Sequence, residues 1–219
     1  MNSHQDTVYF DLETDGVGPD ARITCGVVTG ATTRTDYHSG AGTYLTAEHG
    51  TLMVDELEAA GHVVGFNSAS FDFKMLFALT GDERCKTLAA SHTDVMLAFA
   101  ADKGYFSSMQ SFAGATLGEG EGKTNTGAWA ATAWFKGEAA KVMQYCVDDT
   151  LVLKRLHQHV LKWGMLKRKT KAGHTREWAV PTDTMLTAGA AVAAWQAAPP
   201  ATSWMADPPD IAAALAWCA

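Results

Sequence analysis

The sequence VYFDLETDG, at residues 8–16, places two carboxylates within an apolar, strand-like pattern. Val8, Phe10 and Leu12 recur at every second position, which is typical of a β-strand with one buried face. Side chains alternate between the faces of a strand, so Asp11 and Glu13 share one face and lie roughly 7 Å apart. Two buried like charges repel each other and are costly without a cation beside them. The stretch therefore predicts a strand that carries part of a divalent metal site.

The sequence on both sides of this strand indicates an α/β domain that begins with a three-stranded meander. Runs that are alternating or rich in β-branched residues are separated by Gly, Pro and Asp. These predicted strands cover residues 7–13, 22–28 and 33–38. A helix over 46–60, which Gly61 ends, and a short apolar strand over 62–66 follow.

The remaining pattern is mainly helical and closes with a hairpin. Asp72 lies in the first turn of a helix, 93–99 is either a strand or a short helix, and further helices are predicted over 108–117 and 137–163. Residues 118–127 form a glycine-rich loop. A hairpin over 164–181, turning near 172–173, precedes an alanine-rich helix over 182–198. We expect a domain over 1–163 and a C-terminal hairpin with helices over 164–219, packed on that domain.

Composition limits the class of protein. The 219 residues are 47% hydrophobic, which is enough for a sizeable core, and no apolar run is long enough to span a bilayer. We expect a soluble, cytoplasmic protein that does not bind a membrane. The four cysteines are widely spaced, which favours buried free thiols over a zinc site or a disulfide framework.

Charge is unevenly distributed along the chain. The net charge is −7, yet eight of the seventeen Lys and Arg residues fall between Lys154 and Arg176, where there is no acid. A solvated charged face and a surface that contacts phosphates both fit such a run. The candidates for phosphate contact are Lys154, Arg155, Lys167, Arg168 and Lys169.

The long helix carries a second pair of candidate functional side chains. Tyr145 and Asp149 are four residues apart and share a face, whereas Asp148 is rotated about 100° from Asp149. Asp148 is therefore expected to face solvent or to form an ion pair. Asp94 is interpreted as a structural cap, His157 as a surface residue, and the tryptophans mainly as packing residues.

Taken in order, these motifs resemble those of the DEDD superfamily of 3′-5′ exonucleases. The resemblance comprises Asp11-x-Glu13, the segment from Asn67 to Phe71 and Asp72, and the late Tyr145 and Asp149, and it extends over about 8–156. It implies a ribonuclease H-like fold, with a mixed sheet flanked by helices. One branch of the family has a histidine five residues before the last acid, where this chain has Gln144. The other has a tyrosine four residues before it, so Tyr145 resembles the tyrosine branch.

The same resemblance implies two divalent metal ions held by Asp11, Glu13, Asp72 and Asp149. Oxygen ligands without Cys or His favour Mg²⁺, with Mn²⁺ as a substitute. Asn67 and Phe71 would help to hold the substrate, and Tyr145 would orient the attacking water. The predicted reaction is 3′-5′ hydrolysis of single-stranded nucleic acid, with DNA slightly favoured over RNA. An RNA 3′-end trimming enzyme and a catalytically silent nucleic-acid-binding module are the alternatives.

Overall fold

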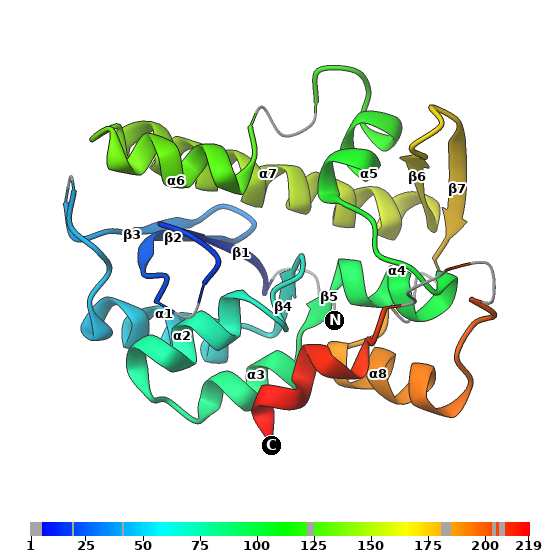
Figure 1. Ribbon diagram of the computed structural model, residues 1–219, viewed down its shortest axis with the longest axis horizontal. Helices are drawn as coiled ribbons and strands as arrows, with labels where there is room; N and C mark the ends of the chain where they lie inside the picture. Colours follow the sequence, from blue (N-terminus) through cyan, green and yellow to red (C-terminus); the bar gives the residue numbers. More distant parts are fainter. Residues whose placement is uncertain are drawn as a thin grey trace.

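The computed structural model describes residues 6–18, 20–40, 42–121, 125–180, 185–202, 205 and 209–219. A five-stranded mixed sheet with the strand order β3-β2-β1-β4-β5 lies at its centre (Figure 1). β1 pairs antiparallel with β2 and parallel with β4, so it is the middle strand. The predicted opening meander and mixed sheet are confirmed. The strands are β1 (Thr7–Thr14), β2 (Ile23–Thr29), β3 (Arg34–Tyr37), β4 (His62–Gly65) and β5 (Thr93–Asp94).

One face of the sheet is covered by three helices that follow the meander and β4. They are α1 (Ala47–Ala59), α2 (Asp72–Thr80) and α3 (Arg84–Ser91). Phe10 and Leu12 of β1 point into this layer, where they share an apolar core with Phe73. The side chain of Thr46 accepts a hydrogen bond from His49 N and begins α1, as the sequence predicts.

The opposite face is covered mainly by the long helix α7 (Ala139–Trp163), which crosses above β1 and β2 (Figure 1). Three shorter helices precede it, namely α4 (Val95–Lys103), α5 (Met109–Thr116) and α6 (Gly127–Phe135). Because β1 alternates, Tyr9 faces this layer and packs with Leu153 and Leu156 of α7. The two apolar layers hold β1 on both faces, which fixes the strand that carries Asp11 and Glu13.

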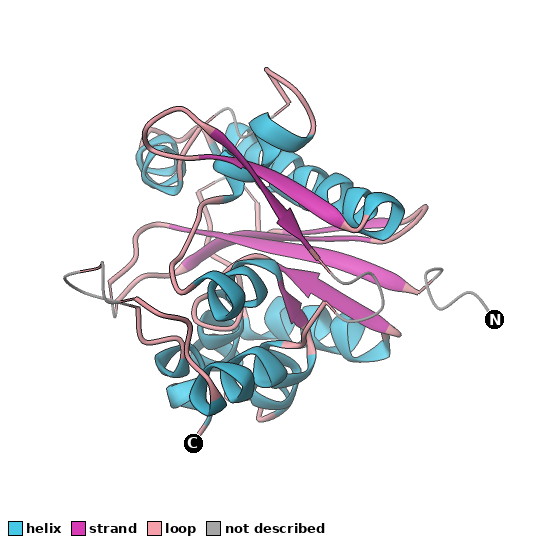
Figure 2. Cartoon of the chain, turned by 90° about the vertical axis from the view of Figure 1, so that its right-hand side faces the viewer, coloured by secondary structure: helices cyan, strands magenta, loops and turns pink. Residues whose placement is uncertain are grey.

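The C-terminal part contains the predicted hairpin, β6 (Met165–Lys169) and β7 (Thr175–Ala179), which lies on the α7 side of the sheet (Figure 2). Thr116 at the end of α5 exchanges hydrogen bonds with the backbone of Lys167, at 2.8 and 2.9 Å. Trp178 is buried and donates from Nε1 to Asp102 Oδ2 at 3.0 Å. The hairpin is therefore attached to the residues that precede α7.

The last helices pack on the other side of the molecule. α8 (Ala188–Ala197) contacts α3 and α4, and a 3-10 helix, η1 (Ala212–Cys218), contacts α3 and α8. Trp217 donates from its indole to Ala69 O at 2.8 Å. Residues 181–184, where the predicted alanine-rich helix would begin, lie outside the described residues.

Several expectations differ from the structure. α3 and α6 were not predicted, and the segment expected to be either a strand or a short helix contains both, β5 followed by α4. His157, expected at the surface, is buried, and its Nδ1 lies 3.0 Å from Tyr9 Oη. Trp163 is 60% exposed rather than packed.

The cysteines are free thiols, as expected. Three of them are buried, namely Cys25, Cys85 and Cys146, and Cys218 is half-buried. In the described ranges no helix combines the length and the apolar character needed to cross a membrane.

Candidate metal centre and catalytic site

Asp11 and Glu13 project from β1 toward α7, as the alternation of the strand predicts. Asp11 pairs with Val27 and Glu13 with Cys25 across the β1–β2 ladder, and the register shifts immediately after Glu13. Glu13 is buried and Asp11 is half-buried. Both carboxylates are therefore fixed by a central strand at the end where its regular pairing stops.

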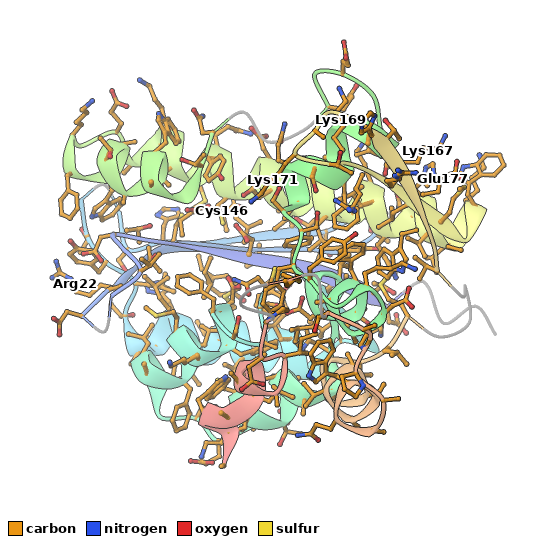
Figure 3. The ribbon with its side chains drawn as sticks, turned by 45° about the vertical axis from the view of Figure 1, so that its right-hand side comes forward. Arg22, Cys146, Lys167, Lys169, Lys171 and Glu177 are labelled. Carbon is orange, nitrogen blue, oxygen red and sulfur yellow. The ribbon has the colours of Figure 1, made fainter. Side chains whose placement is uncertain are left out.

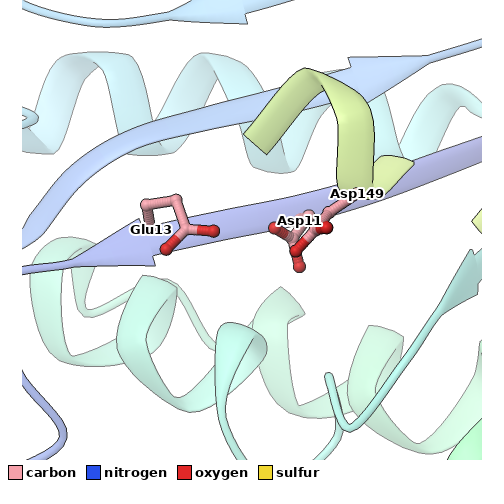
Figure 4. A group of neighbouring side chains, drawn as sticks. All are labelled: Asp11, Glu13 and Asp149. Carbon is pink, nitrogen blue, oxygen red and sulfur yellow. The ribbon is translucent and has the colours of Figure 1, made fainter. Parts of the chain in front are cut away.

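Asp149 reaches the same place from α7. Asp11, Glu13 and Asp149 each offer one carboxylate oxygen, and these oxygens all lie within 4.8 Å of one another. Figure 4 shows the side chain of Asp149 descending from α7 to Asp11 on β1. Asp149 is 1% exposed. The predicted meeting of the first and last acidic motifs is thus present in the fold.

The packing of α7 explains why Asp149 points at the strand. Val142, Cys146 and Leu153 follow the helical repeat and are buried beneath α7. Cys146 donates from Sγ to Asp11 O at 3.3 Å, and Thr150 Oγ1 lies 3.1 Å from Thr29 Oγ1 of β2. These contacts fix both the rotation of α7 and its position along the sheet.

Asp72 is the first residue of α2 and comes to β1 from the opposite side of the fold. Its Oδ1 accepts a hydrogen bond from Leu12 N at 3.0 Å. The β1–β4 ladder ends at the pair Tyr9 and Val64, so β4 does not pair with Leu12. Asp72 is therefore held between the positions of Asp11 and Glu13 along β1, although it is not one of the three acids whose oxygens cluster most closely.

The loop before α2 is held by Asp94, which is completely buried. Its carboxylate accepts hydrogen bonds from Asn67 N at 2.9 Å and Ala69 N at 3.0 Å. It also accepts from Met96 N and Leu97 N, and so begins α4. The expected structural role of Asp94 is confirmed, and it includes positioning the segment that leads to Asp72.

Asn67 occupies an unusual backbone conformation in this loop. Its φ of 64° makes it the one described non-glycine residue in the left-handed region, where asparagine is tolerated better than most residues. Its Oδ1 accepts a hydrogen bond from Ser70 Oγ at 2.6 Å. Phe71, the cap residue before α2, is half-buried. The proposed contacts of Asn67 and Phe71 with substrate stay predictions.

Tyr145 lies one helical turn before Asp149 and is also buried. Its ring meets that of Trp129 edge to face, with centroids 5.6 Å apart, and its hydroxyl donates to Asn125 O at 3.4 Å. Trp129 and Asn125 were not identified from sequence, because α6 itself was not predicted. Asp148 instead accepts a hydrogen bond from Gln144 Nε2 at 2.8 Å, on the exposed side of α7.

The thiol of Cys146 is a structural group in this environment. Burial raises its pKa well above the usual value, and neighbouring Cys25 and the carboxylates of Asp11 and Glu13 raise it further. A protonated thiol donates a hydrogen bond and is a poor nucleophile. The local chemistry therefore depends on the carboxylates rather than on this cysteine.

The cations on α7 that were predicted to contact substrate already bind other parts of the protein. Lys154 donates from Nζ to Gly30 O at 2.6 Å and to Ala31 O at 3.0 Å, which joins α7 to the turn after β2. Arg155 forms an ion pair of 2.5 Å with Glu121. Lys154 thus has an observed structural role, and its proposed contact with phosphate stays a prediction.

The hairpin cations are more accessible. Figure 3 shows Lys167, Lys169 and Lys171 around the hairpin and the end of α5. Lys167 lies 3.8 Å from Glu177 and Lys169 lies 3.6 Å from Glu119, and both lysine side chains are about half exposed, at 42% and 51%. These are long ion pairs at the surface, and such pairs contribute little to stability.

Arg168 is held more firmly than its two neighbours. Its guanidinium donates to Tyr105 Oη and lies 4.8 Å from the centre of that ring and 5.6 Å from the centre of Phe99. Arg168 therefore packs the hairpin against α4 and the loop that follows it. The guanidinium of Arg168 is already engaged in this packing, and its contact with phosphate stays a prediction.

The clustered acids fit a divalent cation by the chemistry of their donor atoms. Three carboxylates are close enough together to bind one cation. Asp72 is hydrogen-bonded to Leu12, which lies between Asp11 and Glu13 on β1. Hard oxygen donors of this kind suit Mg²⁺ or Mn²⁺ better than metals that prefer sulfur or imidazole. The burial of Glu13, Asp72 and Asp149 makes a compensating positive charge more important than at a surface cluster.

A central mixed sheet, with carboxylates gathered on its first strand and on the helix that covers it, defines a ribonuclease H-like domain. The family model of the RNase H superfamily matches residues 8–161, and the chain belongs to that superfamily. This membership supports a nuclease that acts on nucleic acid with divalent metal ions. No curated protein matches the sequence.

Among solved structures, the chain is similar to the family B DNA polymerase from the hyperthermophilic archaeon Pyrobaculum calidifontis. The TM-score is 0.55 and the identity 16%, over 71% of this chain and 24% of the polymerase. At this identity the similarity concerns the fold alone. The chain spans about a quarter of the length of that polymerase. The hairpin and the last helices lie beyond the residues that the family model matches.

Proposed function

We propose that this protein is a metal-dependent 3′-5′ exonuclease that hydrolyses phosphodiester bonds at single-stranded 3′ ends. DNA is slightly favoured over RNA as the substrate. The observation that carries the proposal is the convergence of Asp11, Glu13 and Asp149, whose carboxylate oxygens lie within 4.8 Å of one another. Tyr145, one turn before Asp149, supports the tyrosine branch of the resemblance.

Asp11, Glu13, Asp72 and Asp149 are the proposed ligands of two divalent ions. When bound, two such ions would stabilise the charge on the attacking and leaving oxygens of an in-line phosphodiester displacement. Asp11 and Glu13 are fixed by the sheet, and Asp149 by the packing of α7, so little reorganisation of the chain is needed. Asp72 joins this set through its hydrogen bond to Leu12. Such preorganisation is a major part of catalysis by charge stabilisation.

Tyr145 is the proposed positioning group for the attacking water. A tyrosine hydroxyl has an unperturbed pKa of ~10 and is a weak base at neutral pH, so its proposed role is to orient water by hydrogen bonding. The edge-to-face contact with Trp129 and the hydrogen bond to Asn125 limit the orientations of its ring. Asn67 and Phe71, at the entrance to α2, are proposed to hold the terminal nucleotide.

The direct test uses purified protein with single-stranded DNA and RNA of one sequence, each labelled at the 5′ end. Reactions contain Mg²⁺, Mn²⁺ or EDTA. A 3′-5′ exonuclease shortens the labelled strand progressively, requires the metal, and is slowed by blocking the 3′ end. Immediate release of a labelled mononucleotide, or cleavage only at internal positions, would contradict the proposed polarity.

Two neighbouring acids on α7 provide a matched pair of variants. Asp149→Asn removes a proposed ligand and should lower the rate by about a thousandfold, since a metal ligand contributes several kcal/mol of charge stabilisation. Asp148→Asn changes the adjacent residue, which interacts with Gln144, and should change the rate less than threefold. If wild-type protein binds oligonucleotides but cleaves neither DNA nor RNA with either metal, the silent binding module is the better description.

A further inference from the structure

A second concave site lies on the same side of the sheet as the acids. It is a cavity of about 330 Å³ between β2, the segment after β3, and helices α6 and α7. This volume is at the lower end of the range for ligand pockets. The described residues that line it are Thr24, Cys25, His38, Gly40, Trp134, Ala139, Ala140 and Met143.

Thr24 enters this cavity through an irregularity in the sheet. Glu13 pairs with Cys25 and Thr14 pairs with Ile23, so Thr24 is the extra residue of a β-bulge. Bulges redirect side chains and are frequent beside functional sites. Thr24 is 1% exposed, and its Oγ1 has no hydrogen-bond partner among the described residues. An unsatisfied buried hydroxyl destabilises the folded state, and a ligand that accepts or donates a hydrogen bond would offset that cost.

The cavity is separate from the proposed catalytic site. Met143 and Tyr145 are two residues apart on α7, so their side chains leave the helix about 200° apart. Tyr145 faces Trp129, whereas Met143 faces the cavity on the other flank of the helix. Cys25, across the ladder from Glu13, lies between the two sites.

The described walls determine the chemistry that would fit. No Asp, Glu, Lys or Arg is among the described lining residues, so the cavity favours an uncharged molecule. Trp134 presents an aromatic wall, Met143 a polarizable thioether, and Ala139 and Ala140 small apolar groups, which together suit a flat ring.

Two polar groups could orient such a ring. His38 Nδ1 accepts a hydrogen bond from Gly40 N at 3.3 Å, which leaves the proton on Nε2 as a donor at the exposed side of the cavity. Thr24 supplies the second group, because a rotation of about 120° between staggered χ1 rotamers carries the hydroxyl to the position of the methyl, and the methyl to that of the Cβ hydrogen. We propose that this cavity is a second ligand site, which binds an uncharged aromatic heterocycle of one or two rings.

The test measures binding of adenine and indole as probes, by ligand-observed NMR and by equilibrium dialysis of the full-length protein. Both are flat and uncharged near neutral pH, and adenine also offers hydrogen-bonding groups. Wild-type protein is expected to bind at least one probe at submillimolar concentration, with adenosine 5′-monophosphate binding more weakly because of its charge. No binding of either probe at millimolar concentration would overturn the proposal.

Met143→Trp fills the cavity and should weaken binding at least tenfold. Leu151→Trp introduces the same side chain at an exposed position of the same helix and should leave binding unchanged. Retained affinity in Met143→Trp, with its fold verified by circular dichroism, would show that the probes bind elsewhere and would overturn the assignment.

Thr24→Val provides an independent test that does not enlarge the side chain. It removes the unsatisfied hydroxyl at nearly constant volume, so it should raise the melting temperature and weaken adenine binding severalfold. These opposite effects distinguish a ligand-binding hydroxyl from one that stabilises the fold. A lower melting temperature together with unchanged affinity would contradict the proposed role of Thr24.

Discussion

The acidic site and the basic hairpin contrast in how strongly the fold constrains their charges. The acids lie on β1, α2 and α7, elements whose other faces are buried in the two main cores. The hairpin cations lie on a two-stranded ribbon, where Lys167 and Lys169 are about half exposed and their ion pairs with Glu177 and Glu119 are long. A buried charge needs a specific partner, whereas water can solvate an exposed one. The acidic motif therefore carries more functional information than the longer basic run.

The largest expected effect would test the acidic half of this contrast. Asp72→Asn and Asp72→Ala should both lower cleavage by about a thousandfold, because each removes a proposed metal ligand. They should differ in stability. Asparagine can still accept the hydrogen bond from Leu12 N, whereas alanine leaves that amide without this acceptor, at a cost of about 1–3 kcal/mol.

Steady-state kinetics and urea unfolding of the two Asp72 variants would measure these effects. Equal losses of stability would show that the hydrogen bond to Leu12 is unimportant. Full activity in the asparagine variant would remove Asp72 from the ligand set and weaken the two-metal interpretation.

A smaller effect is expected for Tyr145→Phe. The ring and its contact with Trp129 remain, so the change removes only the hydroxyl that is proposed to orient water. The catalytic rate at saturating substrate should fall by about a hundredfold, within the usual range for a group that assists proton transfer. Binding of a single-stranded oligonucleotide, measured by fluorescence anisotropy in EDTA, should be nearly unchanged. A loss that appears only in binding would assign Tyr145 to substrate contact.

The dependence of the free energy of unfolding on pH should also distinguish a buried histidine from one on the hairpin. His92 is buried, its Nδ1 lies 3.0 Å from the carbonyl oxygens of Leu88 and Ala89, and its Nε2 lies 2.7 Å from Ser68 Oγ. Burial lowers its pKa below the usual value, although the charge of Asp94 opposes this shift. The folded state therefore binds fewer protons than the unfolded state, in which the pKa is ~6.5.

It follows that the free energy of unfolding decreases as the pH falls from about 6.5 toward the lowered pKa of His92. The slope should reach up to about 1.4 kcal/mol per pH unit. Urea unfolding between pH 7.5 and 5 would measure it, with His92→Gln expected to flatten the curve. His174→Gln, at an exposed position in the hairpin turn, is the control and should leave the slope unchanged.

The smallest expected effect concerns the hairpin lysines. Lys167→Ala combined with Lys169→Ala should weaken binding of single-stranded DNA severalfold at moderate salt. It should also reduce the slope of log K against log salt by about 0.7 for each phosphate that the variant no longer neutralises. The rate at saturating substrate should not change. An unchanged salt slope would identify this surface as a solvated charged face.

Lys154→Ala and Arg168→Ala are informative comparisons for that experiment. Lys154 holds the turn after β2, and Arg168 packs on Tyr105 and Phe99, so each variant should lose about 1 kcal/mol of stability. If Lys154→Ala weakens DNA binding more than the loss of Lys167 and Lys169 does, the nucleic acid path runs closer to α7 than proposed. A larger loss in Arg168→Ala would keep the path on the hairpin and assign the phosphate contact to Arg168.

The strands of the meander, α7 and the hairpin could be predicted because each has a clear local period or turn signal. α6 could not, since its alanine-rich sequence follows a glycine-rich loop and has no strong polar face. Without α6, neither Trp129 nor the hydrogen bond from Tyr145 to Asn125 could be anticipated. The burial of His157 was also missed, because its partner Tyr9 is distant in sequence.

The sequence by itself determined which candidate site residues share a face of one element. The carboxylates of Asp11 and Glu13 share a strand face, and Tyr145 and Asp149 share a helix face, because strand and helix periods are local properties of the chain. The tertiary structure alone decided that these two faces meet. It also brought Asp72 to the edge of β1 beyond the β4 pairing and opened a cavity at the bulge beside Glu13. Such contacts depend on how whole elements pack, and long-range packing is set by the combined burial of many side chains rather than by any one motif.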